Sequence, residues 1–195
     1  MKYFQRMILV VLFLMGVTSL SIAMEKGKSP VKGMSKEALV KLALSAAPAN
    51  IAKDSSVMVP GEEGKMVEAK KGSNGFTCFP DVDGQEVPDP VCADQAASQW
   101  INDLMSGAPK PTNTAPGFSY MAKGGWHFEK EGKILMKEEP GAQRVSEPPH
   151  WMIFWPVDSK ASGIPSLPSK FGTYVMFEGT PYAHLMIYQS PKTLK

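Results

Sequence analysis

Two short segments of the chain repeat one pattern of side chains that can bind metals. Residues 150–154 and 184–188 each contain a histidine, an apolar residue, a methionine, an isoleucine and an aromatic residue, in that order. Side chains alternate across a strand, so the histidine and methionine of each segment share a face. If the two strands are neighbours in register, imidazole and thioether groups converge in a set that suits copper, the thioether favouring Cu(I). The four candidate ligands are His150, Met152, His184 and Met186.

These residues also have an ordinary structural interpretation. Methionine and aromatic residues that alternate in short strands commonly fill irregular gaps in a core. A two-residue His/Met spacing is also much less specific than a CxxC pair. His127 is a third imidazole, but nothing in the sequence places it near the others. Core packing is therefore the first interpretation, and a copper site is the alternative.

An acidic loop offers a second candidate cation site. Asp81 and Asp83 are followed directly by Gly84, which resembles part of a calcium-binding turn. An EF-hand loop needs a third oxygen ligand before the glycine and a bidentate glutamate six residues after it, where this chain has Pro90. The pattern therefore favours a solvated acidic loop over a calcium site at Asp81 and Asp83.

The chain contains two cysteines, Cys78 and Cys92. An even number in an exported chain indicates a disulfide. A redox pair usually has CxxC spacing, which places both thiols at one helix start, whereas these two are far apart in sequence. The sequence therefore predicts a structural disulfide that closes a polar, turn-rich loop.

No catalytic signature survives inspection of the sequence. Ser119 lies in a segment that lacks the second glycine of a nucleophile elbow, and the predicted disulfide leaves no free thiolate. The pair Gly124 and Gly125 does not precede a helix with a lysine, as a phosphate-binding loop would. We therefore expect a protein without catalytic activity, and keep an unrecognised hydrolase as a residual alternative.

Residues 1–23 have the pattern of a secretory signal peptide. Lys2 and Arg6 precede an apolar run from Met7 to Leu20, and small residues follow up to Ala23. About 14 apolar residues are fewer than the ~20 that span a bilayer. We expect cleavage after Ala23, a periplasmic or secreted location, and no membrane segment in the remaining chain.

The charge of the chain bears on its partners. Lys2 and Arg6 account for the whole formal net charge of +2, so the chain after Ala23 is formally neutral. It contains no dense stripe of lysine and arginine. Binding of nucleic acid needs such a positive surface, so we expect no nucleic-acid partner.

The remaining pattern predicts the elements that position these residues. Residues 24–34 are charged and contain glycine, which is typical of a mobile leader. Helical spacing predicts one helix from Ser35 that ends before Pro48, and a second over residues 94–105. Short alternating segments between Gly- and Pro-rich turns are strand candidates. They are residues 56–59, 65–70, 76–79, 118–121, 133–137, 150–155, 173–177 and 183–188. We therefore predict a single α+β domain over residues 35–195, with an antiparallel sheet of short strands, two helices and one disulfide.

Several short motifs give the chain a resemblance to a known group. They are Ala46-Ala47-Pro48 with Ile51-Ala52 and Val57-Met58, Asn74-Gly75-Phe76-Thr77-Cys78 with Pro80-Asp81 and Cys92, Ser119-Tyr120-Met121, the His-x-Met-Ile that begins at His150, and Gly179-Thr180-Pro181-Tyr182-Ala183-His184. Together these motifs resemble a group of short uncharacterised exported bacterial proteins, over most of residues 42–188. The resemblance implies one compact domain and no known activity.

These observations lead to two functional hypotheses of different classes. The first is a secreted or periplasmic, non-catalytic binding or interaction module with an unidentified protein or small-molecule partner. The second is an envelope metal-binding protein of copper type that uses His150, Met152, His184 and Met186. The two hypotheses differ in whether the imidazoles converge.

Overall fold

The computed structural model describes residues 30–61, 65–81, 84 and 87–194 of the chain. The predicted signal peptide and the first residues of the predicted leader lie outside this part. The last residues of that leader differ from the expectation, because residues 30–34 form a turn and Val31 is buried in the core. Within the described residues, no helix combines the length and apolar character needed to cross a membrane.

The two predicted helices are present, and each begins at the expected cap. Helix α1 (Lys36–Leu44) starts where the Ala38 amide donates to the Ser35 hydroxyl, and α3 (Gln95–Met105) starts where the Ala97 amide donates to Asp94. The described part of the chain also contains shorter helical turns that were not predicted. They are α2 (Ala49–Ala52), α4 (Ser159–Ser162) and a 3-10 turn at Pro191–Thr193.

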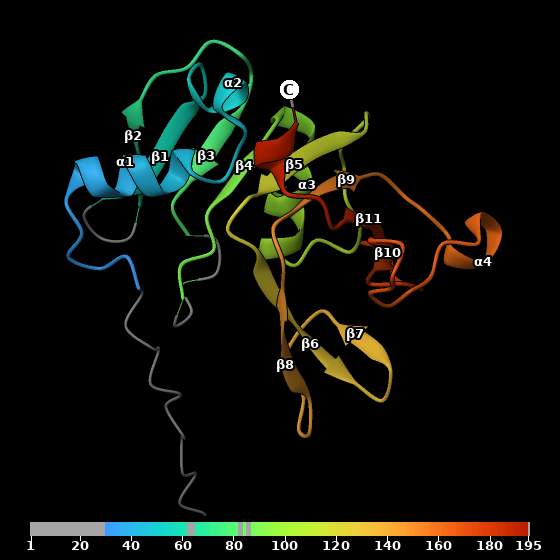
Figure 1. Cartoon of the computed structure of the whole chain (residues 1–195). Coiled ribbons are helices and arrows are strands. Elements are labelled where there is room, and N and C mark those ends of the chain that lie inside the picture. Colours follow the sequence, from blue (N-terminus) through green and yellow to red (C-terminus); the bar gives the residue numbers. More distant parts are fainter. Residues whose placement is uncertain (1–29, 62–64, 82–83, 85–86, 195) are drawn as a thin grey trace, which may run out of the picture.

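A large sheet of eight short strands forms the centre of the molecule (Figure 1). Its strand order is β10-β11-β9-β5-β4-β3-β1-β2, and each pair is antiparallel except β1 with β3. The two strands expected near residues 56–59 and 65–70 are present as β1 and β2, and they pair antiparallel. The strands are β1 (Ser56–Pro60), β2 (Met66–Lys70), β3 (Thr77–Phe79), β4 (Val91–Ala93), β5 (Gly117–Met121), β9 (His150–Phe154), β10 (Thr173–Met176) and β11 (His184–Ile187).

A second sheet of three strands projects from the first as an arm (Figure 1). It consists of β6 (Gly125–Lys130), β7 (Lys133–Leu135) and β8 (Gln143–Glu147), in the order β7-β6-β8. Of these strands, the sequence predicted β7 alone.

The two sheets share one bent ribbon. Strand β5 continues into β6, and β8 continues into β9. The two long stretches pair with each other on both sides of the bend. Met121 lies opposite His150 in the large sheet, and Gly125 lies opposite Glu147 in the arm. Pro148 and Pro149 interrupt one stretch, and proline cannot continue the ladder of hydrogen bonds. The bend therefore lies between the end of β8 at Glu147 and the start of β9 at His150.

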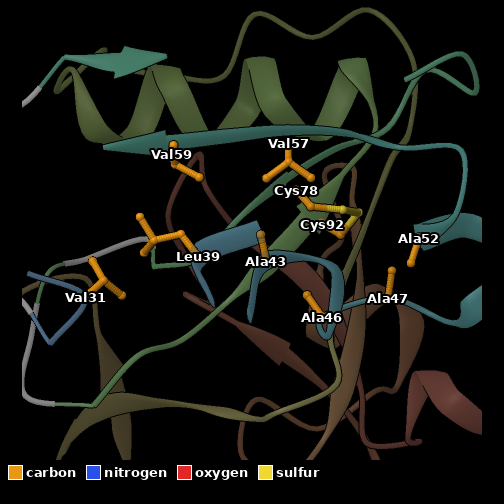
Figure 2. Packing of buried hydrophobic residues seen from close by; sticks show 10 residues of the cluster. All are labelled: Val31, Leu39, Ala43, Ala46, Ala47, Ala52, Val57, Val59, Cys78 and Cys92. Carbon is orange, nitrogen blue, oxygen red and sulfur yellow. A yellow bond between two sulfur atoms is a disulfide. The ribbon is translucent and has the colours of Figure 1, made fainter. Parts of the chain in front are cut away.

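Two apolar clusters lie on the large sheet. The first packs α1 against β1, β3 and β4, and Figure 2 shows its side chains around the Cys78–Cys92 disulfide. The second packs α3, with Trp100 at its centre, against β9, β10 and β11. In β4, Cys92 belongs to the first cluster and its neighbour Ala93 to the second, so the clusters lie on opposite faces of the sheet.

The predicted disulfide is confirmed. Cys78 of β3 and Cys92 of β4 are directly opposite each other in the ladder, and both are fully buried. The predicted class is confirmed as well: the chain is a single α+β domain with a mostly antiparallel arrangement of short strands.

Candidate functional site

The structure places the two His/Met strands side by side. Strands β9 and β11 are antiparallel neighbours, with Met152 directly opposite Met186. Both methionines and both histidines are buried. Because the strands run in opposite directions, His150 lies at one end of the methionine pair, beside Tyr188, and His184 at the other, beside Phe154. The register therefore does not gather the four candidate ligands around one point.

His184 is enclosed by aromatic rings. Its ring centroid lies 4.8 Å from those of Trp100 and Phe154 and 5.6 Å from that of Phe177. Its Nδ1 donates a hydrogen bond to the Tyr182 carbonyl at 3.0 Å. Burial lowers the pKa of His184 to about 4, so the imidazole is neutral at physiological pH. These contacts are those of a core residue.

His150 belongs instead to a buried polar network centred on Glu147. One carboxylate oxygen of Glu147, Oε1, accepts hydrogen bonds from His127 Nδ1 and from the Tyr174 hydroxyl, both at 2.7 Å. The Tyr188 hydroxyl donates in turn to the Tyr174 hydroxyl at 3.2 Å. The other oxygen, Oε2, faces His150 Nε2 at 3.6 Å. The network thus joins β6, β8, β9 and β10 at the bend between the sheets.

The environment favours a charged Glu147 and a neutral His150. Burial alone would raise the pKa of Glu147, but the hydrogen bonds from His127 and Tyr174 hold it below its ordinary value. Burial lowers the pKa of His150, although the carboxylate of Glu147 opposes that effect. A carboxylate therefore faces an uncharged imidazole inside the protein.

The acidic loop is described only in part. Asp81 is present, with a buried Oδ1, whereas Asp83 lies outside the described residues, so the calcium interpretation stays a prediction. Across the described ranges, no three side chains of the His, Cys, Asp or Glu type are arranged to hold a metal ion.

A cleft with an exposed tryptophan opens at the end of β9. It has a volume of about 470 Å³, and Trp155, which lines it, is 41% exposed. The cleft brings together the connection between α3 and β5, the segment after β9, and the turn before β11. Its lining residues are Lys110, Pro111, Asn113, Trp155, Pro156, Val157, Asp158, Thr180, Pro181 and Ala183.

Partly buried hydrogen bonds fix the walls of this cleft. Asp103 of α3 accepts from both the backbone amide and the hydroxyl of Thr112, at 2.6 and 2.8 Å. The Asn113 amide donates to the Phe154 carbonyl at 3.1 Å, and the Tyr182 hydroxyl donates to the Ala108 carbonyl at 2.8 Å. The connection between α3 and β5 is thus a preformed wall of the cleft.

The turn on the opposite wall has a strained backbone. Phe177 has φ 54°, a left-handed conformation that is rare for a bulky residue. The amide and hydroxyl of Thr180 both donate to the Phe177 carbonyl, at 3.1 and 2.8 Å, and hold the turn in place. Such strain is often found where a structure shapes a binding site.

Sequence reasoning missed Glu147 and the role of Trp155. Glu147 precedes two prolines, and the segment was expected to be a turn rather than the end of a strand. Trp155 was assigned to the end of a strand, although an aromatic residue followed directly by Pro156 was a signal that the strand had ended and that the ring could lie in a loop.

Comparison with models of protein families, with curated proteins and with solved structures finds no match to this chain. The functional argument therefore rests on the geometry of the molecule itself.

Proposed function

We propose that this chain is a non-catalytic binding module that holds a neutral sugar ring in the Trp155 cleft. The observation that carries this proposal is an exposed indole on a preformed cleft of about 470 Å³. Cavities of this size suit small ligands, and fixed walls reduce the entropy that a ligand must overcome on binding.

The chemistry of the cleft suits a ligand with one apolar face and polar edges. A sugar ring presents C–H groups on its face and hydroxyls around its rim, and the flat face of an indole complements the C–H groups. Asn113 and Thr180 line the cleft as well; the Asn113 amide nitrogen and the Thr180 hydroxyl already donate within the protein, so their side-chain oxygens are offered to a ligand as hydrogen-bond acceptors. Lys110 and Asp158 bring one positive and one negative charge, which favours a ligand without net charge.

The buried network supports a non-catalytic role. His127, Glu147 and His150 are the side chains best suited to acid–base chemistry, and they are 4%, 8% and 0% exposed. General acid–base catalysis requires such groups within hydrogen-bonding reach of a substrate. Their burial therefore favours binding over hydrolysis.

An exported location fits this role. We infer a periplasmic or secreted protein from the signal-peptide pattern of residues 1–23, and the Cys78–Cys92 disulfide is consistent with an oxidising compartment. The resemblance to short exported bacterial proteins agrees with this proposal.

The experiment is calorimetric titration of the purified chain with neutral oligosaccharides of glucose and N-acetylglucosamine, together with fluorescence of the indoles. We expect saturable binding of at least one oligosaccharide, and a loss of about tenfold or more in affinity for Trp155→Ala, since aromatic anchors carry much of the energy of a binding site.

The matched control is Phe171→Ala. Phe171 is also aromatic and is 76% exposed, but it does not line the cleft. Its replacement should leave the affinity unchanged. Equal losses in both variants, or no binding of any neutral oligosaccharide, would contradict the proposal.

A further inference from the structure

The bend between the two sheets contains two electron-rich atoms that face each other without a partner between them. His150 Nδ1 lies 2.8 Å from the Pro148 carbonyl oxygen. A carbonyl only accepts hydrogen bonds, so Nδ1 carries the ring proton and, in the neutral ring, Nε2 presents its lone pair. This Nε2 is buried without a hydrogen-bond partner and lies 3.6 Å from Glu147 Oε2.

From this geometry we propose that the bend binds a divalent transition-metal ion between His150 Nε2 and Glu147 Oε2. The site does not involve the Trp155 cleft. It shares one residue, His150, with the ligand set predicted from the sequence, and it replaces the other three with the carboxylate of Glu147.

The distance between the two atoms suits a shared ion. Zinc lies about 2.0–2.1 Å from imidazole nitrogen and carboxylate oxygen, and two such ligands at a tetrahedral angle are about 3.4 Å apart. The observed 3.6 Å needs almost no rearrangement. A cation at this point also resolves the contact between a buried lone pair and a carboxylate, which is otherwise unfavourable.

The groups behind both ligands are those that usually support a metal centre. Metal-binding histidines donate their second ring N–H to a carbonyl or carboxylate, and metal-binding carboxylates accept hydrogen bonds of their own. His150 donates to the Pro148 carbonyl, and Glu147 accepts from His127 and Tyr174. These contacts hold Nε2 and Oε2 toward each other before any ion arrives.

Gly125 leaves space next to the pair. A Cβ atom built on Gly125 would lie 3.7 Å from His150 Cε1, 3.8 Å from Glu147 Oε2 and 3.1 Å from Met121 Cε. Gly125 also lines a cleft of about 320 Å³, together with Gly124, Trp126 and Ser146. Gly125 thus borders both the pair and this cleft, although His150 and Glu147 do not line the cleft themselves. We therefore expect an ion to enter past Gly125, which has no side chain to block the way.

The donor set selects the class of metal. One imidazole nitrogen and one carboxylate oxygen suit Cu²⁺, Zn²⁺ and Ni²⁺, and among these Cu²⁺ binds most tightly to a given site. Within the described residues the site has two His or Glu ligands rather than three or more, so the ion is exchangeable rather than structural. We expect affinity in the micromolar range.

The experiment is titration of the purified chain at pH 7.5 with Cu²⁺ and Zn²⁺, by calorimetry and by electron paramagnetic resonance for Cu²⁺. We expect one ion per chain and a Cu²⁺ spectrum with one coordinated nitrogen. The affinity should fall at least tenfold in His150→Gln and in Glu147→Gln, with circular dichroism confirming that both variants are folded.

Two further variants guard against misfolding as the cause. Gly125→Ala keeps both ligands but puts a methyl group into the space beside them, and it should also lower the affinity at least tenfold. His184→Gln removes the buried imidazole beside Trp100 and should leave binding unchanged.

Three results would overturn the proposal. They are no binding of either ion by the unmodified chain, binding that survives both Glu147→Gln and Gly125→Ala, and a Cu²⁺ spectrum with two or more nitrogens. Oligosaccharide binding is measured separately through Trp155, so failure of one proposal is distinguishable from failure of the other.

Discussion

The burial of His184 makes the stability of the protein depend on pH in a range where few other groups titrate. In the unfolded chain this imidazole has its ordinary pKa of 6.5, whereas burial among aromatic rings lowers the pKa to about 4 in the folded protein. Below pH 6.5 the unfolded state therefore takes up a proton that the folded state does not. The contribution of His184 to folding stability is fully present above pH 6.5 and is lost as the pH falls toward 4.

The size of this effect follows from the two pKa values. The difference between the two pKa values of His184 lowers the free energy of unfolding by about 3 kcal/mol below pH 4. Between pH 7.5 and pH 5 the loss is about 2 kcal/mol. The groups whose charges act on His184 are Glu147 and His150. The lowered pKa of His150 adds a loss in the same direction, while the lowered pKa of Glu147 acts below its ordinary value of 4.5, outside this window.

The variant His184→Asn isolates the contribution. An asparagine amide can replace the Nδ1–H that donates to the Tyr182 carbonyl, but it does not titrate. The variant loses ring contacts with Trp100 and Phe154 and should be less stable at pH 7.5 by about 2–4 kcal/mol. Its further loss between pH 7.5 and pH 5 should nevertheless be about 2 kcal/mol smaller than that of the unmodified chain.

Urea unfolding followed by indole fluorescence at the two pH values measures both quantities, with His150→Asn as a comparison for the second buried imidazole. If the unmodified chain and His184→Asn lost the same free energy between pH 7.5 and pH 5, within about 0.5 kcal/mol, the neutral buried imidazole would not be the cause, and the reasoning would fail.

Three other predictions concern the network, the packing of α3 and the disulfide. Tyr174→Phe removes the hydroxyl that donates to the Glu147 carboxylate and should lower the free energy of unfolding by about 2–3 kcal/mol. Tyr188→Phe removes a hydrogen bond between two neutral hydroxyls and should lower it by about 1 kcal/mol. Urea unfolding at pH 7.5 measures both losses, and equal losses would contradict the assigned network. Gly117→Ala places a Cβ in collision with the Ala97 backbone nitrogen, so it should cost about 3 kcal/mol and lower the melting temperature. An unchanged melting temperature would mean that α3 can shift away from β5 without loss of stability. The double variant Cys78→Ser with Cys92→Ser should have a free energy of unfolding lower by up to about 3 kcal/mol. Mass spectrometry of the unmodified chain without reduction should find no free thiol.

Local signals in the sequence predicted most of the elements. Ser35 and Asp94 each stand before a helical stripe of apolar residues, and both helices begin there because a side-chain oxygen can accept from an amide of the first turn. The strands of the large sheet were also recognisable, with the exception of β4. These features depend on residues a few positions apart, and a single sequence contains that information.

The arm was not predicted because its stability depends on pairing between distant segments. Strand β8 is largely polar, and its residues are mostly exposed or half-buried, so no hydrophobic alternation marks it. It exists because it pairs with β6, where His127 lies opposite Val145 and Gly125 opposite Glu147. Glu147 therefore acquires its role from a contact twenty residues away, with His127, which no local pattern encodes.

The direction of the strands decided what the repeated His/Met motif became. Two copies of one motif on parallel neighbours in register would place like residues side by side, the two histidines together. On antiparallel neighbours with Met152 opposite Met186, the same spacing places the histidines at opposite ends of the methionine pair. One end lies against α3, so His184 is packed among aromatic rings; the other lies at the bend between the sheets, so His150 meets the Glu147 carboxylate. The two copies of the motif thus hold a core residue in one case and part of a polar centre in the other, because the chain returns in the opposite direction.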